Sequence, residues 1–262
     1  MPITPELADE LANTYLAAEL LRQPIEPIRE RHPELGEEEA YTIQAALVQH
    51  KLVGGLIKRG YKIGATNAGA MAAFGLSQPV YAWLFDAGYV VSGARIEHAA
   101  LIHPRLECEI CFRMGAELRG PAVTPEQAQS AAEAVCAAFE IVDSRTAGWA
   151  AKQVEMVSDN VFAARYVLSE QWVSAAGLDL AAVEAVVQKN GSEVARASGA
   201  NVLGGPSIAL AWLANRLAAH GQYLAPGDIV MAGSLTPLVP IAAGDQFSAT
   251  LNGLGEVLSE FY

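Results

Sequence analysis

The stretch that decides the fold is PRLECEICF, residues 104–112, which places two glutamates one residue apart in an otherwise apolar run. Read as a β-strand, it points Leu106 and Ile110 to one side and Glu107 and Glu109 to the other, because side chains alternate along a strand. The Cβ atoms of the two glutamates are then about 6–7 Å apart. The apolar neighbours predict a central strand, so two carboxylates are aimed at one buried place.

Two like charges this close raise each other's pKa unless a cation neutralises them. Arg105 and Arg113 flank the pair, but no lysine or arginine lies between the two glutamates. A divalent cation that prefers oxygen ligands, Mg²⁺ or Mn²⁺, suits such a pair. Further carboxylates, Glu140 and Asp143, follow in AFEIVDSR (138–145). The alternative is a solvent-facing strand edge, where charged residues are common.

Composition excludes several classes of function. The chain has 262 residues, of which 52% are hydrophobic, and a net charge of −12, which argues against binding nucleic acid through its phosphates. The N-terminus has no basic segment before an apolar run, and no stretch approaches about 18 uninterrupted apolar residues. We therefore expect a cytoplasmic protein with no membrane span and no signal peptide.

Three cysteines, an odd number without a disulfide-like spacing, fit a reducing compartment. Cys108 and Cys111 form a C-x-x-C motif, which can indicate a zinc or redox site. A second pair is missing, and a strand would turn the two thiols to opposite faces. We interpret these cysteines as buried small residues.

The order of the expected elements predicts an α+β fold, with an N-terminal helical region at 1–57 and a catalytic β-rich domain at 58–262. Helices first, followed by many short strands with few helices between them, favour this class over a doubly wound parallel sheet. Helices are predicted at 4–22, 36–52, 68–76, 124–139 and 207–221, and strands at the start of 60–67 and at 81–91, 95–102, 105–113, 140–145, 162–168, 182–188, 228–232 and 247–257.

Three further residues are candidates for binding a substrate. Lys62 lies in the apolar, glycine-bounded GYKIGAT (60–66), where an anionic group could hold its ammonium. The alternative is a surface lysine that extends its charge to solvent. Ser234 and Thr236 place hydroxyls beside a glycine turn in GSLTPLVP (233–240), although this segment alone is also typical of an ordinary loop.

Several fragments, taken in order, resemble one known family. They are YKIGAT, HPRLECEI, FEIVDSR, VSDN, NVLGGPSIALAWLAN and LAPGDIVMAGSLTPLVPIAAGDQF, preceded by HPEL and AYTIQ. Together they resemble the hydratase/decarboxylase branch of the fumarylacetoacetate hydrolase superfamily over nearly the whole chain. The resemblance implies a mixed β-sheet roll, a homo-oligomer, and Mg²⁺ or Mn²⁺ bound by Glu107, Glu109 and Glu140. It also implies that Lys62 is catalytic, because it contacts and polarises the 2-oxo acid end of a small-molecule substrate.

The resemblance implies a lyase of aromatic meta-cleavage catabolism. The first expectation is a hydratase that adds water to a 2-hydroxy-2,4-dienoate and forms a 4-hydroxy-2-oxo acid. The alternatives are a 4-oxalocrotonate-type decarboxylase and an inactive partner subunit. Hydrolysis of an acylpyruvate is less favoured, because no His-Glu pair that would activate water is evident. Association with another enzyme of the same pathway is also expected.

The chain departs from the family pattern at three places. Val80 and Ala82 stand where hydratases of the family usually carry Asp and Gly. Gly205 replaces a usual His, and Asn67 replaces a common Ser. Because the missing Asp is associated with proton transfer in hydratases, Val80 favours the decarboxylase alternative.

Overall fold

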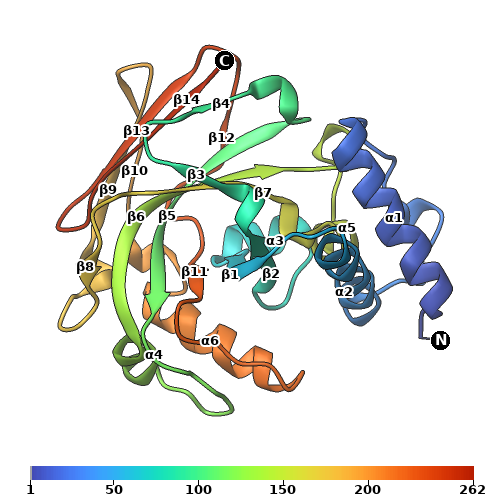
Figure 1. Ribbon diagram of the computed structural model, residues 1–262, viewed down its shortest axis with the longest axis horizontal. Helices are drawn as coiled ribbons and strands as arrows, with labels where there is room; N and C mark the ends of the chain where they lie inside the picture. Colours follow the sequence, from blue (N-terminus) through green and yellow to red (C-terminus); the bar gives the residue numbers. More distant parts are fainter. Residues whose placement is uncertain (1) are drawn as a thin grey trace.

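Two β-sheets form the framework of the computed structural model, which describes residues 2–262 (Figure 1). The larger sheet runs β2-β1-β11-β5-β6-β7-β3, with β12 beside β5 and β8 beside β6, and the smaller runs β10-β9-β13-β14-β4. Each sheet mixes parallel and antiparallel pairs. The strands are β1 Lys58–Gly64, β2 Val80–Phe85, β3 Tyr89–Val91, β4 Arg95–Ile96, β5 Pro104–Met114, β6 Ala132–Asp143, β7 Ala163–Leu168, β8 Val173–Ser174, β9 Glu184–Lys189, β10 Ser192–Ser198, β11 Ile229–Met231, β12 Val239–Pro240, β13 Gln246–Leu251 and β14 Gly255–Phe261.

Residues 2–262 contain six α-helices. In Figure 1, α1 and α2 lie on the opposite side of the molecule from the smaller sheet. The helix α2 packs against both α1 and α5, and α4 packs against α6. The helices are α1 Pro5–Leu21, α2 Glu37–Val53, α3 Ala68–Phe74, α4 Pro125–Ala131, α5 Gln153–Ser158 and α6 Pro206–Ala218. The α+β class expected from the order of elements is confirmed.

The two longest strands, β5 and β6, form the centre of the larger sheet. They pair antiparallel over nearly their whole lengths, with Glu107 opposite Glu140 and Cys111 opposite Cys136. A strand on each outer side, β11 beside β5 and β7 beside β6, removes any free edge. The predicted central position of the strand at 105–113 is therefore confirmed.

The helix predicted at 124–139 is wrong in its second half. The α-helix ends at Ala131, and residues 132–139 form the first part of β6. The alanine-rich segment AEAVCAAF has a good helix propensity. Its pairing with β5 and β8 buries it in the sheet instead, so tertiary contacts outweigh the local preference.

Other boundaries differ from the sequence-based expectation for local reasons. The single strand predicted at 247–257 is a hairpin of β13 and β14, whose turn contains Gly253 at a φ of +76°. The strand predicted at 81–91 is interrupted by a 3₁₀ turn at Asp86–Gly88, and that predicted at 95–102 is only the two residues of β4. The strand β10 and the short helix α5 were not predicted.

The helices α1 and α2 precede the first strand, which begins at Lys58. The side chain of Gln44 on α2 donates hydrogen bonds to the carbonyl oxygens of Tyr81 and Val157, so the helical region is tied to the sheet. The division into 1–57 and 58–262 stays a prediction. None of the helices within residues 2–262 has the length and apolar character needed to cross a membrane.

Candidate active site

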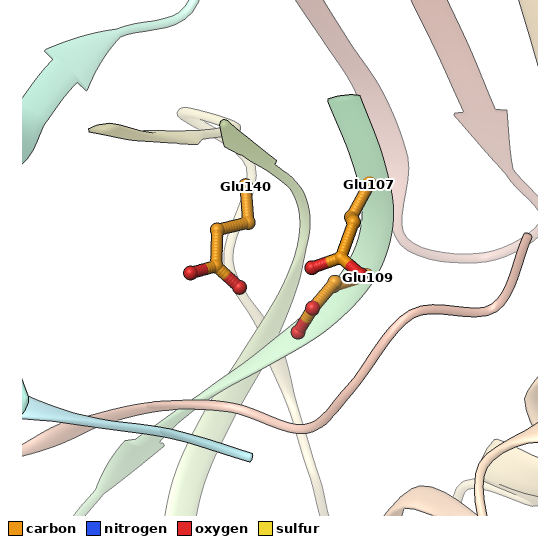
Figure 2. A group of neighbouring side chains, drawn as sticks. All are labelled: Glu107, Glu109 and Glu140. Carbon is orange, nitrogen blue, oxygen red and sulfur yellow. The ribbon is translucent and has the colours of Figure 1, made fainter. Parts of the chain in front are cut away.

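Three carboxylates meet on one face of the β5–β6 pair. Glu107 lies directly opposite Glu140, and Glu109 is two residues further along the same face of β5. One carboxylate oxygen from each lies within 4.8 Å of the others. Figure 2 shows the three side chains projecting from the two strands into one space. The face predicted from period-2 alternation thus exists, and Glu140 joins it from the neighbouring strand.

The carboxylate cluster is buried and short of hydrogen-bond donors. Glu109 and Glu140 are fully buried, whereas the side chain of Glu107 is 16% exposed. The backbone N–H of Gly233 donates to Oε2 of Glu109 at 2.8 Å. The other Glu109 oxygen and Oε1 of Glu140 have no hydrogen-bond partner among the described residues. Buried polar atoms without partners are costly.

Burial raises the pKa of Glu140 to about 8, and the negative charge of Glu107 adds to this rise. The pKa of Glu109 is raised well above its ordinary value, first by burial and then by Glu140 and Glu107. Three clustered carboxylates, two of them buried with a raised pKa, fit a hard divalent cation, because such an ion prefers oxygen ligands and neutralises negative charge.

Lys62, on β1, is buried beside this cluster rather than extended to solvent. Its Nζ lies 3.1 Å from Oε2 of Glu140 and 3.9 Å from Oε2 of Glu107. The same ammonium donates to the carbonyl oxygen of Val161 at 3.1 Å. Burial alone would lower the pKa of Lys62, but the nearby carboxylates, Glu140 foremost, raise it above the ordinary value. The ammonium therefore stays charged.

The carbonyl of Val161, which accepts the hydrogen bond from Lys62, belongs to an unusual turn. Asn160, Val161 and Phe162 have φ angles of 47°, 48° and 62°. Residues other than glycine rarely adopt this left-handed conformation, and a β-branched valine is especially disfavoured. The amide of Asn160 holds the turn by bonding both the N–H and the C=O of Trp83 on β2. Sequence reasoning missed the hydrogen bond from Lys62 to Val161, because every residue has a backbone carbonyl and the residue pattern does not distinguish one from another.

A cavity of about 610 Å³ opens over the cluster. Lys62 and Glu107 line it, and so do Ser234 and Thr236 from the loop after β11. The hydroxyl of Ser234 donates to the carbonyl of Thr236 at 2.8 Å, whereas the buried hydroxyl of Thr236 has no partner among residues 2–262. Most of the remaining wall is apolar and includes Phe74 and other aromatic residues. Such a cavity is the size of a small-molecule site.

The loop after β11 approaches the cluster through a glycine. Gly233 has a φ of +113°, and a Cβ at this position would lie 2.4 Å from Oγ1 of Thr66. Only glycine fits this approach, which brings its N–H to Glu109. The glycine that opens GSLTPLVP was visible in the sequence, but its hydrogen bond to Glu109 was not.

Other candidate residues lie outside the cluster. Asp143 accepts hydrogen bonds from the backbone N–H groups of Ile102 and His103, so Glu140 and not Asp143 is the third carboxylate. All three cysteines are buried free thiols, and Cys108 packs in a different part of the core from Cys111. The C-x-x-C motif does not form a joint thiol site.

Of the positions that depart from the family pattern, only Asn67 is among the residues that line the cavity. Asn67 lines it and also accepts a hydrogen bond from the N–H of Ala70, which caps α3. Val80 is fully buried on β2 opposite Gly64, on the same face of the sheet as Lys62. Gly205, immediately before α6, is not among the lining residues.

The fold and the site agree with one protein family. The model of the fumarylacetoacetate (FAA) hydrolase C-terminal domain matches residues 59–261. The chain therefore belongs to the fumarylacetoacetate hydrolase family. Within that family it lies in the branch of hydratases and decarboxylases, because its full-length relatives carry these two activities in their names.

Three relatives represent this branch. A 2-hydroxyhexa-2,4-dienoate hydratase of Comamonas testosteroni is 38% identical over 90% of this chain and 90% of its own. A 4-oxalocrotonate decarboxylase of Pseudomonas sp. (strain CF600) is 33% identical over 97% and 95%, respectively. The solved structure of the 4-oxalocrotonate decarboxylase from Pseudomonas putida G7, complexed with magnesium and adipate, has a TM-score of 0.96 and 32% identity and covers 99% of both chains.

Proposed function

We propose that the protein is a divalent-metal-dependent hydratase that adds water to a 2-hydroxy-2,4-dienoate and forms a 4-hydroxy-2-oxo acid, in the breakdown of aromatic compounds. The observation that carries this proposal is the cluster of Glu107, Glu109 and Glu140 beside the Lys62 ammonium in a mainly apolar cavity. The hydratases among the relatives support it.

The carboxylate cluster would hold Mg²⁺ or Mn²⁺. The donor set is all oxygen, and one oxygen each of Glu109 and Glu140 has no hydrogen-bond partner among residues 2–262. The raised pKa values of Glu109 and Glu140 mark a place where a cation is favoured. When bound, a divalent ion supplies a Lewis acid that draws electron density from a 2-oxo group. The magnesium complex of the decarboxylase relative is consistent with this choice.

The side chains of this cavity would position the 2-oxo acid. Lys62 presents a fixed ammonium to an oxygen at the 2-oxo end, since its own position is set by Val161 and Glu140. The partnerless hydroxyl of Thr236 can donate to a carboxylate, and Ser234 supports the same loop. The apolar wall of the cavity excludes water from the carbon atoms of the substrate beyond its 2-oxo acid end. Binding at one end therefore leaves the unsaturated carbons against an apolar surface.

A second candidate is the loss of CO₂ from a 2-oxo-enedioate, as in the 4-oxalocrotonate decarboxylases. The observation that favours it is Val80, which is buried, apolar and on the same face as Lys62. The carbon–carbon bond to the far carboxylate breaks and releases CO₂. Its electron pair moves through the conjugated carbons to the 2-oxo oxygen, and no side chain needs to deliver water. The residues that hold the 2-oxo end are the same in both reactions.

Purified protein with Mg²⁺ or Mn²⁺ should be incubated separately with 2-hydroxypentadienoate and with 2-hydroxymuconate, and the products identified by mass spectrometry. A 4-hydroxy-2-oxo acid formed from the first compound supports the hydratase. Release of CO₂ from the second without addition of water contradicts the hydratase and supports the decarboxylase. No reaction and no binding of either metal by calorimetry would favour an inactive partner subunit.

The association state and location are part of the same proposal. Family membership supports a homo-oligomer in the cytoplasm, with contact to another enzyme of the same pathway. Light scattering after gel filtration measures the subunit number directly. Co-purification with the enzyme that consumes or supplies the dienoate tests the second association.

A further inference from the structure

Arg105 lies on β5 two residues before Glu107, so its side chain leaves the strand on the same face as the carboxylate cluster. It lines the cavity of about 610 Å³ and also a neighbouring hollow of about 320 Å³. The residue therefore stands where the site opens outward. Neither the metal-binding cluster nor the Lys62 contacts described above account for it.

The guanidinium of Arg105 lies over an aromatic ring. Its Cζ lies 4.1 Å from the ring centroid of Trp149. That ring is fixed in turn, because its indole N–H donates to the carbonyl of His103 and it packs in a T-shaped arrangement against Phe162, with ring centroids 5.3 Å apart. A guanidinium that lies over an aromatic ring can still offer its N–H groups to a planar acceptor.

No anion satisfies this guanidinium among residues 2–262. Arg105 makes neither an ion pair nor a side-chain hydrogen bond there, whereas the other lining cation, Lys62, is neutralised by Glu140 and Glu107. The side chain is partly buried, and no carboxylate among residues 2–262 pairs with it. The cost of removing a charge from water is therefore left for a ligand to offset.

We propose that Arg105 is a carboxylate-binding residue of this cavity, which receives a carboxylate group of the substrate on the outer edge of its guanidinium. This inference rests on the proposed function for its substrate, a 2-oxo acid. Arginine and carboxylate form two parallel hydrogen bonds, which fix orientation as well as affinity. The carboxylate is either the one beside the 2-oxo group or a second one at the far end of a dicarboxylate.

The test compares Arg105→Met and Arg105→Lys with a matched control, Arg196→Met, on an exposed arginine of β10 outside the cavity. KM and kcat are measured with 2-hydroxypentadienoate, which has one carboxylate, and with 2-hydroxymuconate, which has two. Charged hydrogen bonds of this kind predict a KM increase of roughly 10- to 100-fold for Arg105→Met, with partial recovery in Arg105→Lys. Mg²⁺ affinity and circular dichroism should match the wild type.

The two substrates identify which carboxylate is bound. A KM increase with both compounds assigns Arg105 to the carboxylate beside the 2-oxo group, and an increase with 2-hydroxymuconate alone assigns it to the far carboxylate. An unchanged KM with both overturns the inference. Equal losses in Arg105→Met and Arg196→Met also overturn it, because the effect is then not specific to the cavity.

A binding measurement separates this inference from the proposed reaction. In the presence of Mg²⁺, 2-oxoadipate and 2-oxopentanoate are titrated by calorimetry, and neither requires turnover. If the wild type binds one of these 2-oxo acids and Arg105→Met weakens that binding by about tenfold or more, the role of Arg105 stands even where the protein converts neither dienoate. Equal affinity in the variant and the wild type overturns the role of Arg105 and leaves the proposed reaction intact.

Discussion

Glu107 and Glu140 lie directly opposite each other in the antiparallel β5–β6 pair, with the Lys62 ammonium within 4.0 Å of both. Like charges in directly opposed positions destabilise a sheet. The lysine offsets part of this repulsion, but Glu109 adds a third carboxylate to the same face. The arrangement costs stability in the protein alone, and a divalent ion would reverse that cost.

Replacing one carboxylate should remove metal binding. We expect Glu140→Gln to weaken Mg²⁺ binding at least about 100-fold, since even residues that only support metal ligands contribute about 10- to 100-fold. Activity should disappear with it, while the fold persists because the amide keeps the volume of the side chain. Calorimetric titration measures the affinity. The control is Glu256→Gln, an exposed carboxylate on β14. Undiminished Mg²⁺ affinity in Glu140→Gln would exclude this residue as a ligand.

Lys62→Met should separate the role of the ammonium from that of the metal. Removal of a positive charge beside the three glutamates favours binding of another cation, so the Mg²⁺ affinity should be retained or increased. Turnover should nevertheless fall by about 100-fold or more if Lys62 holds the 2-oxo end. Calorimetry and steady-state kinetics are compared on the same preparation. Loss of metal binding together with activity would mean that Lys62 only organises the cluster.

The metal-free protein should become less stable as the pH rises. The pKa of Glu140 is raised from 4.5 to about 8, so between these values the folded state binds a proton that the unfolded state has released. The unfolded state then binds fewer protons, and the free energy of unfolding falls with increasing pH across this window. Thermal unfolding in a chelator from pH 5 to pH 9 measures the effect. The slope should be smaller in Glu140→Gln, and a slope of the opposite sign would refute the prediction.

Gly233→Ala should disturb both the loop and the cluster. The backbone has a positive φ and its added Cβ would meet Thr66, so we expect a loss of about 2 kcal/mol or more of stability. The matched control is Gly244→Ala, where φ is also positive but no atom lies within 4 Å of the added Cβ. Urea unfolding compares the two variants. Equal losses would show that backbone strain alone, and not the contact with Thr66, requires glycine.

The local pattern was enough to predict the metal-binding face of β5, because alternation along a strand fixes which side chains share a side. The local pattern was not enough to predict the third carboxylate, Glu140. Glu140 stands opposite Glu107 only because β6 begins at Ala132, within a segment whose alanines favour a helix. A resemblance to a known family supplied what periodicity could not.

Backbone groups account for most of what the sequence did not reveal. The carbonyl of Val161 and the N–H of Gly233 contact Lys62 and Glu109, and every residue type carries such groups. Arg105 was visible only as a flanking charge, because the ring that orients it comes from Trp149, more than forty residues away. Contacts between segments that are distant in the sequence depend on the folded topology rather than on the residues adjacent in the sequence.

The left-handed turn at 160–162 has a consequence for anyone who wishes to redesign this enzyme. Because a main-chain oxygen of Val161 fixes the ammonium, exchanging the valine side chain leaves the anchor in place. Asn160 is the better target, since its amide clamps the turn to β2. Libraries that vary position 160 and the facing strand would therefore change the position of the Val161 carbonyl, and with it that of the lysine.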